Sequence, residues 1–209
     1  MIKLAEGSFN QVFLLTMDTR EQIIARIPHP NAGPVHYTTA SEVATMHYLR
    51  TKLQLPVPHV IAYSCDPTNP VGSEYILMER IHGVDLSTKW DALNDQKKSK
   101  ILDCLAQLQS KLLTTRFSSY GNLYFTSDIP TALCAPRMYD EPSPDDSTYC
   151  IGPITERMFW ERDRSGNRGP CMIPRNYFNG RDIGRRLLDC YMSARDRMDP
   201  KICNTTISG

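Results

Sequence analysis

Long apolar runs are absent from this 209-residue sequence, and no stretch approaches the roughly 20 apolar residues that a membrane-spanning helix needs. A surplus of charge is absent as well, because 24 lysine and arginine residues stand against 23 aspartate and glutamate residues. A formal net charge of +1 creates no long-range field that would attract nucleic acid or anionic lipid. We therefore expect no membrane span and no nucleic-acid partner.

Targeting signals and metal-binding patterns are also missing. Residues 1–7 contain neither an apolar signal core nor an Arg- and Ser-rich transit stretch, so the default expectation is a cytoplasmic protein. The seven cysteines are widely spaced without a C-x-x-C pair, which favours reduced thiols over a disulfide scaffold or a zinc site. The five histidines form no H-x-H or H-x-x-x-H pair, so we predict no metal site.

What the sequence does contain is a change of hydrophobic period along its length. The first 82 residues hold short apolar or alternating runs that are typical of strands, bounded by turn-forming residues. One helix interrupts them, and it is predicted to begin at Thr39 because Thr39-x-x-Glu42 fits a capping box. The five predicted strands cover residues 2–5, 12–15, 22–27, 59–64 and 74–80.

The second half of the sequence has a helical period. Apolar residues recur at steps of three and four over residues 101–112, which predicts a long amphipathic helix with Asn94 or Asp95 as its cap. Residues 120–170 are rich in Pro, Gly, Asp and Ser, and we expect an irregular segment there, either a functional loop or a poorly ordered one. A last amphipathic helix is predicted over about residues 180–198.

A glycine- and serine-containing turn joins the first two predicted strands. It consists of Gly7, Ser8, Phe9 and Asn10. Such a backbone can close over phosphate groups, with its N–H groups as donors. An ordinary hairpin turn is the commoner explanation when this turn is taken alone.

A cation in the third predicted strand needs an anionic partner. Arg26 stands in an apolar run, and burying an unpaired charge would cost several kcal/mol. In kinases a cation at this place contacts nucleotide phosphates and pairs with a glutamate on the following helix. Glu42 stands where that glutamate is expected, although it can equally close the capping box with Thr39.

The fifth predicted strand runs out into a glycine at residue 83. Its last residues include Met78 and Glu79, and Ile81 follows them. An exposed backbone edge from Glu79 to Ile81 can hydrogen-bond an adenine ring. The alternative is that a strand simply ends at a turn, which is the commoner event.

These segments together resemble the aminoglycoside phosphotransferase family of small-molecule kinases, and in particular its fungal members, which include the altered-inheritance-of-mitochondria proteins. The resemblance implies an α+β, protein-kinase-like fold. Residues 1–82 would form a nucleotide-binding N-lobe with a five-stranded antiparallel sheet and one helix, and residues 83–209 would form an incomplete helical C-lobe. The blocks that carry the resemblance are residues 3–7, 9–10, 12–15, 24–28, 41–45, 56–58, 72–79, 120–124 and 169–170.

The resemblance also implies roles for the residues of these blocks. The turn from Gly7 to Asn10 would cover the phosphates of ATP, bound with Mg²⁺, and residues 78–81 would form the hinge. Arg26 would stand in for the lysine of the third strand, with Glu42 as its partner. Arginine keeps the charge of lysine but replaces a point donor with a planar fork. Ser8 replaces a glycine that is common at that place in the family.

The catalytic motifs of the family are missing from these 209 residues. Phosphoryl transfer in such a fold needs an H-x-D-x-x-x-x-N loop and a later metal-binding aspartate. The run from His82 to Asp85 has one residue too many and comes too early, and Asp199 and Asn204 have the right spacing but Arg197 replaces the histidine. We therefore expect a truncated chain that is inactive by itself, without its Mg²⁺ ligands, and that retains weak nucleotide binding.

Two other interpretations of the sequence remain open. The chain can be a non-catalytic regulatory or scaffold module, in which Arg26 and Glu42 form only a structural pair and the middle segment binds a partner. It can also be a truncated gene product without a stable function. The phosphoryl acceptor cannot be identified from the sequence, and exposed apolar surface on the incomplete lobe would favour self-association. The family resemblance adds mitochondria to the cytoplasm as an expected location.

Overall fold

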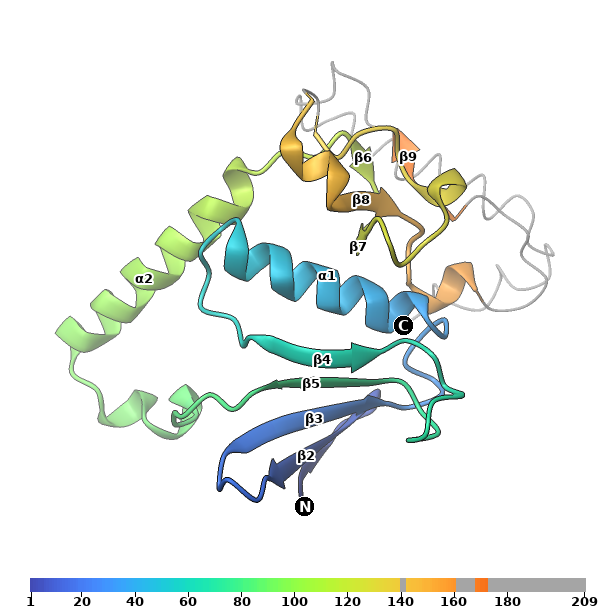
Figure 1. The fold of residues 1–209 in the computed structure, drawn as a ribbon. Coiled ribbons are helices and arrows are strands. Elements are labelled where there is room, and N and C mark those ends of the chain that lie inside the picture. Colours follow the sequence, from blue (N-terminus) through green and yellow to red (C-terminus); the bar gives the residue numbers. More distant parts are fainter. Residues whose placement is uncertain (140–141, 161–167, 173–209) are drawn as a thin grey trace, which may run out of the picture.

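The computed structural model describes residues 1–139, 142–160 and 168–172. Five antiparallel strands form its main sheet, in the order β1-β2-β3-β5-β4 (Figure 1). The strands are β1 (Ile2–Glu6), β2 (Asn10–Thr16), β3 (Gln22–Pro28), β4 (Val60–Ser64) and β5 (Tyr75–Glu79). The α+β fold with a five-stranded antiparallel sheet is confirmed, whereas the helix expected over residues 180–198 lies outside the described residues.

Helix α1 (Tyr37–Thr51) lies between the main sheet and the C-terminal part of the described chain (Figure 1). Its sheet side packs through Val43 against Ile76 and Met78 of β5. Its opposite side packs through Ala40 and Tyr48 against a second group of strands. Because two layers cover the helix, apolar residues are needed on both of its sides.

The predicted capping box of α1 is wrong. The N-cap is His36 and not Thr39, and no side chain caps the helix from that position. Thr39 is buried inside the first turn, and the carboxylate of Glu42 pairs with Arg26. The helix begins earlier because the buried carboxylate of Glu74 accepts a hydrogen bond from the backbone N–H of His36 at 2.5 Å, a contact between residues 38 positions apart that no local pattern records.

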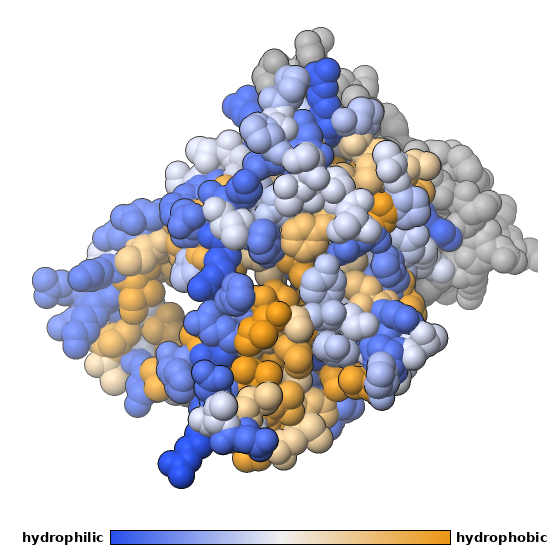
Figure 2. Space-filling model, viewed as in Figure 1, coloured by the Kyte–Doolittle hydropathy of each residue, from blue (hydrophilic) through white to orange (hydrophobic). Residues whose placement is uncertain are grey.

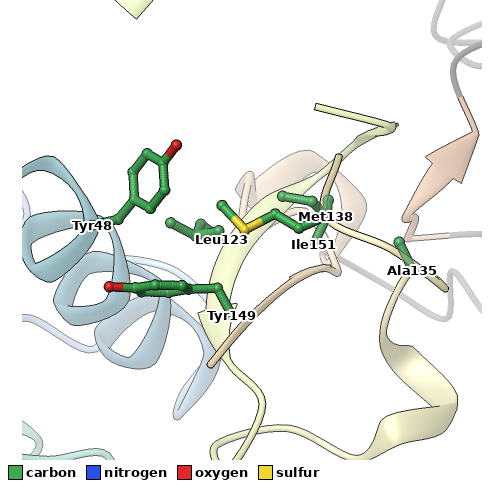
Figure 3. Close-up of a cluster of buried hydrophobic side chains, with 6 residues drawn as sticks. All are labelled: Tyr48, Leu123, Ala135, Met138, Tyr149 and Ile151. Atoms are coloured by element: carbon green, nitrogen blue, oxygen red, sulfur yellow. The ribbon is translucent and has the colours of Figure 1, made fainter. Parts of the chain in front are cut away.

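The segment expected to be irregular contains strands and a packed core. Strand β7 (Asn122–Phe125) pairs with β8 (Tyr149–Gly152), and β6 (Ser119–Tyr120) pairs with β9 (Cys171–Met172). Figure 3 shows side chains from α1, β7, β8 and the intervening loop meeting in one apolar cluster. The expectation of an irregular segment missed these strands, because strands of two to four residues are too short to show a period of two. The cluster consists of Tyr48, Leu123, Ala135, Met138, Tyr149 and Ile151.

Helix α2 (Asp95–Thr114) follows the main sheet and extends along one side of the molecule (Figure 1). Asn94 is its N-cap, and its side chain accepts a hydrogen bond from the backbone N–H of Lys97 at 3.0 Å. The helix buries none of its side chains, and apolar residues show along it in Figure 2. None of the described helices is long and apolar enough to cross a membrane. Short 3₁₀ helices cover Leu86–Thr88, Trp90–Ala92, Thr131–Leu133, Pro144–Ser147 and Arg157–Phe159.

Candidate functional site

An ion pair between Arg26 of β3 and Glu42 of α1 forms the centre of the candidate site. Residues two apart on a strand share a face, so Arg26 lies on the same side of the sheet as Ile24, which packs in the core beneath α1. Helix α1 covers that side of the sheet, so Arg26 faces the helix that carries Glu42. The ion pair predicted from the sequence is present. The N-cap position of His36 also removes the alternative in which Glu42 closes a capping box.

The surroundings of Arg26 explain why it needs an anion. Its direct neighbours on the adjacent strands are Val12 and Ile76, both apolar. Burial lowers the pKa of Arg26 from its ordinary value, but an arginine side chain stays protonated in proteins. The two side chains of the pair are 30% and 25% exposed, so a ligand can reach them. A guanidinium has five N–H donors, and one carboxylate does not use all of them.

The turn between β1 and β2 lies at the end of the sheet just beyond Arg26. Asn10 pairs with Pro28, two residues along β3 from Arg26. The backbone N–H of Gly7 donates to the carbonyl of Asn10 at 2.9 Å, so this amide is already used within the turn. Among the described residues, the amides of Ser8 and Phe9 have no hydrogen-bond partner. The turn therefore offers two backbone donors to a ligand, and its residues are exposed or half-buried.

A carboxylate next to this turn is neutralised by its neighbours. Glu6 pairs with Lys3 and accepts a hydrogen bond from Nε2 of Gln11 at 3.3 Å, and Nε2 of His29 lies 3.6 Å from it. The hydrogen bond and charge of Lys3 lower the pKa of Glu6. Sequence reasoning did not single out Glu6, although Lys3 three residues before it was a visible partner.

The three predicted hinge residues have different surroundings. The side chain of Met78 is buried in the core beneath α1. The backbone N–H of Glu79 donates to the carbonyl of His59 at 2.8 Å, and its carboxylate accepts from the His59 N–H at 3.0 Å. Arg50 of α1 lies 3.4 Å from the same carboxylate. Ile81 lies beyond the end of β5 and is exposed, so the backbone is most accessible there.

Strand β3 connects these parts of the site. Glu79 pairs with Ile23 near the start of β3, Arg26 lies in its middle, and the turn residue Asn10 pairs with Pro28 at its end. The five residue-to-residue steps from Ile23 to Pro28 span about 17 Å at about 3.3 Å each. The predicted hinge and the predicted phosphate turn thus lie at opposite ends of one strand, with the ion pair between them.

A buried polar network that the sequence did not reveal holds the beginning of α1. Besides the bond from His36 to Glu74, Nε2 of His36 lies 2.6 Å from the carbonyl oxygen of Asp128. The hydroxyl of Tyr63 donates to the carboxylate of Asp128 at 3.0 Å. Burial raises the pKa of Glu74 above its ordinary value. These partners are far apart in the sequence, so no local pattern predicts the network.

A cavity of about 310 Å³ lies beside α1. Its walls come from α1, the C-terminal end of α2 and strands β7 and β8, and it shares no residue with the predicted site. In the described part of the chain, no three His, Cys, Asp or Glu side chains gather in a way that could hold a metal ion.

Comparison with known proteins places the chain in a family. A model of the phosphotransferase enzyme family matches residues 1–135. A subtelomeric hrmA-associated cluster protein of Aspergillus fumigatus is 47% identical over 174 residues, which are 82% of this chain and 33% of that protein. The mitochondrial altered inheritance of mitochondria protein 9 of Candida tropicalis is 35% identical over 164 residues, which cover 74% and 26% of the two chains. Its namesake in Lachancea thermotolerans is 31% identical over 173 residues, which cover 78% and 28%.

This chain spans between 26% and 33% of the length of these relatives. The family match includes the whole five-stranded sheet, the turn between β1 and β2, and both members of the Arg26–Glu42 pair. The resemblance inferred from the sequence is thereby confirmed, and the chain belongs to the phosphotransferase enzyme family, with its kinase-like fold.

Proposed function

We propose that the main sheet and α1 form the nucleotide-binding part of an ATP-dependent phosphotransferase. The adenine ring would bind the backbone near Met78, Glu79 and Ile81, and the phosphates would bind Arg26 and the turn that contains Ser8. The Arg26–Glu42 pair carries the proposal, because it places a partly exposed guanidinium beside a turn with two unused amides.

Each residue of the site has a defined task in this proposal. The guanidinium of Arg26 donates to phosphate oxygens, and the carboxylate of Glu42 holds its orientation and compensates its charge in the absence of ligand. The amides of Ser8 and Phe9 donate to the same phosphates. The pairing of Glu6 with Lys3 keeps that carboxylate from repelling the bound anion.

For these 209 residues we propose nucleotide binding without phosphoryl transfer. Kinases bind ATP together with Mg²⁺, which would neutralise part of the charge of the phosphates. The described residues do not provide a fitting set of Mg²⁺ ligands, and the 209 residues contain no H-x-D-x-x-x-x-N loop. We therefore propose that the chain by itself binds ATP weakly and does not transfer its γ-phosphoryl group. In a family member that contains the catalytic loop, a hydroxyl group of an unidentified small molecule would accept that group.

The contacts of the predicted hinge favour a second candidate function, that of a non-catalytic scaffold module. The side chain of Met78 belongs to the core, and the amide of Glu79 is already bound by His59. In this interpretation Arg26 and Glu42 join β3 to α1 and bind no ligand. The two functions differ in what happens when Arg26 is removed.

The test is ATP binding by calorimetry, with and without Mg²⁺, on the purified chain and on Arg26→Ala. We expect wild-type binding and at least a roughly tenfold loss in Arg26→Ala, equal to about 1.4 kcal/mol. Arg26→Lys should retain part of the affinity because it keeps the charge. Lys100→Ala on α2 is the control, since this exposed cation lies outside the proposed site.

Thermal melts of every variant separate folding from binding. A folded Arg26→Ala variant that binds ATP as the wild type does would disprove the phosphate role of Arg26. A folded wild-type chain that ignores ATP would favour the scaffold function. The scaffold function would also be favoured if Arg26→Ala fails to fold and the wild type binds no nucleotide.

For location, we propose the mitochondrion over the cytoplasm. The support is that relatives from Candida tropicalis and Lachancea thermotolerans carry the word mitochondrial in their names. Fractionation of cells that express the natural gene product tests this proposal. A product found only in the cytosolic fraction would contradict it.

A further inference from the structure

Two free cysteine thiols meet beneath the beginning of α1. Cys134 follows a short 3₁₀ helix (Thr131–Leu133), and Cys150 lies in β8. Their sulfur atoms are 2.8 Å apart, and the Cys134 thiol donates to the Cys150 sulfur. A disulfide bond requires about 2.05 Å between sulfurs, so closure needs an approach of less than about 1 Å.

A backbone hydrogen bond joins the segments that carry the two thiols. The N–H of Ala135 donates to the carbonyl of Ile151 at 2.7 Å, which ties the residue after Cys134 to the residue after Cys150. The N–H of Cys134 also donates to the carbonyl of Thr131 at 3.0 Å. Cys150 is paired in register with Tyr124 of β7. The fold therefore holds the backbone segments of the two cysteines next to each other.

We propose that Cys134 and Cys150 form an oxidation-sensitive dithiol, reduced at rest and closed to a disulfide by a peroxide. The Cys134 thiolate attacks one oxygen of hydrogen peroxide, the O–O bond breaks, and a sulfenic acid and one water form. The Cys150 sulfur then attacks the Cys134 sulfur, the S–O bond breaks, and the hydroxide leaves as a second water with the remaining thiol proton. The two sulfurs are oxidised and the peroxide is reduced.

Exposure determines the order of these two steps. Cys134 is half-buried, whereas Cys150 is only 4% exposed. Burial and the neighbouring Cys134 both raise the pKa of the Cys150 thiol, which makes it a poor first nucleophile. Peroxide therefore reaches Cys134 first, and Cys150 resolves the sulfenic acid. The reaction requires no large movement, because the second sulfur is already in contact.

The pair lies where it can influence the helix that carries Glu42. Cys150 belongs to a buried cluster with Ala40 of α1 and Tyr124 of β7, and Cys134 packs against the same cluster. A disulfide would tie the loop around Cys134 to β8 at this point and restrict the unfolded chain. Oxidation is thus expected to raise the melting temperature of the chain, and a reductant should reverse the shift.

A third thiol near the cluster provides an internal competitor. Cys65 also packs against this cluster and is partly buried. Burial raises the pKa of Cys65 to about 12. No hydrogen bond joins its sulfur to another described cysteine. If thiol proximity decides the reaction, Cys65 stays reduced while Cys134 and Cys150 join.

Peptide mapping of the whole chain after treatment with hydrogen peroxide tests the proposal. Trypsin separates the cysteines, because Cys134 falls in residues 117–137 and Cys150 in residues 138–157. We expect these two peptides to become linked, with a mass about 2 Da below their sum. The linked species should form before residues 53–80, which contain Cys65, or residues 101–111, which contain Cys104, are modified.

Single variants distinguish the two roles. In Cys150→Ser, the Cys134 sulfenic acid should persist long enough to be trapped by dimedone. In Cys134→Ser, Cys150 should resist the same peroxide dose, and Cys104→Ser on α2 is the control that leaves the linked pair intact. A link between Cys65 and either cysteine would overturn the proposal, as would oxidation of wild-type Cys134 to a sulfinic acid while Cys150 remains a free thiol. The wild-type map decides the question even if a variant fails to fold.

Discussion

Helices α1 and α2 form for different reasons. Helix α2 carries its own local signals, because the side chain of Asn94 caps it and its apolar residues recur at helical spacing. Helix α1 has no side-chain cap, yet it buries six residues, whereas α2 buries none. Helix α1 lies between the main sheet and strands β7 and β8 (Figure 1). Helices of these lengths are marginal by themselves in water, so α1 depends on its packing.

The packing of α1 also determines where Glu42 lies in the candidate site. Glu42 lies on α1, and its position relative to Arg26 is fixed by the two layers that cover that helix. Changes in the packing of α1 are therefore expected to alter both stability and the ion pair. Changes in the exposed apolar residues of α2, such as Leu105, are expected to alter neither, because these side chains are not part of the core.

Truncation of Tyr48 on α1 should have the largest effect. Its ring is 3% exposed and packs against Tyr149 and Phe117, and its hydroxyl lies 2.8 Å from that of Tyr139. We expect Tyr48→Ala to lower the free energy of unfolding by about 3–5 kcal/mol, because it opens a cavity in the core. Urea denaturation followed by circular dichroism measures the loss.

The matched change on α2 is Leu105→Ala, where the side chain is 47% exposed. We expect this change to stay within about 0.5 kcal/mol of the wild type. Equal losses in the two variants would remove the contrast between the helices. They would mean that the apolar side of α2 is covered in solution, for example by self-association of the kind expected from the sequence.

The sequence predicted the main sheet because each strand has a readable pattern. Strand β3, for instance, is an apolar run bounded by turn residues, and the observed bounds Gln22–Pro28 extend the prediction by one residue. The Arg26–Glu42 pair was predictable as well, since a charge within an apolar strand requires a partner. Here a local pattern and an elementary energetic argument were sufficient.

The parts that escaped prediction depend on contacts between distant residues. The start of α1 was misplaced because Glu74 holds it from 38 positions away. The strands β7 and β8 were missed because each has four residues and their pairing spans a loop of more than twenty. The contact between Cys134 and Cys150 likewise follows from this pairing. Such features can be inferred only once the topology is known.

The cap of α2 allows a smaller test of the same contrast. We expect Asn94→Ala to lower the stability of the first turn of α2 by about 1 kcal/mol, because the backbone N–H of Lys97 loses its acceptor. Amide hydrogen exchange should show this as faster exchange at the start of α2. Asn94→Ser is the control, since serine also caps helices well. A loss of ATP affinity in Asn94→Ala would show that α2 and the site are coupled after all.

The N-terminus of α1 is held by Glu74, which directly precedes β5, and the effect of this carboxylate should appear as a dependence of stability on pH. Burial raises the pKa of this carboxyl in the folded state above its ordinary value of 4.5. The folded chain therefore binds more protons than the unfolded chain between 4.5 and the raised value. The contribution of Glu74 to the free energy of unfolding is largest below pH 4.5 and is lost as the pH rises through the folded pKa.

Glu74→Gln should remove this dependence while it keeps an oxygen that can accept from the backbone N–H of His36. We expect the stability of the variant, relative to the wild type, to increase as the pH rises from 4.5, in a series of urea denaturations. Glu21→Gln in the exposed turn before β3 is the control for the loss of one surface carboxylate. If the difference in the free energy of unfolding between Glu74→Gln and the wild type does not change with pH, the hydrogen bonds to the Glu74 carboxylate offset the effect of its burial on the pKa. The ionised carboxylate of Glu74 would then stabilise the N-terminus of α1 in the same way that the side chain of Asn94 stabilises the N-terminus of α2.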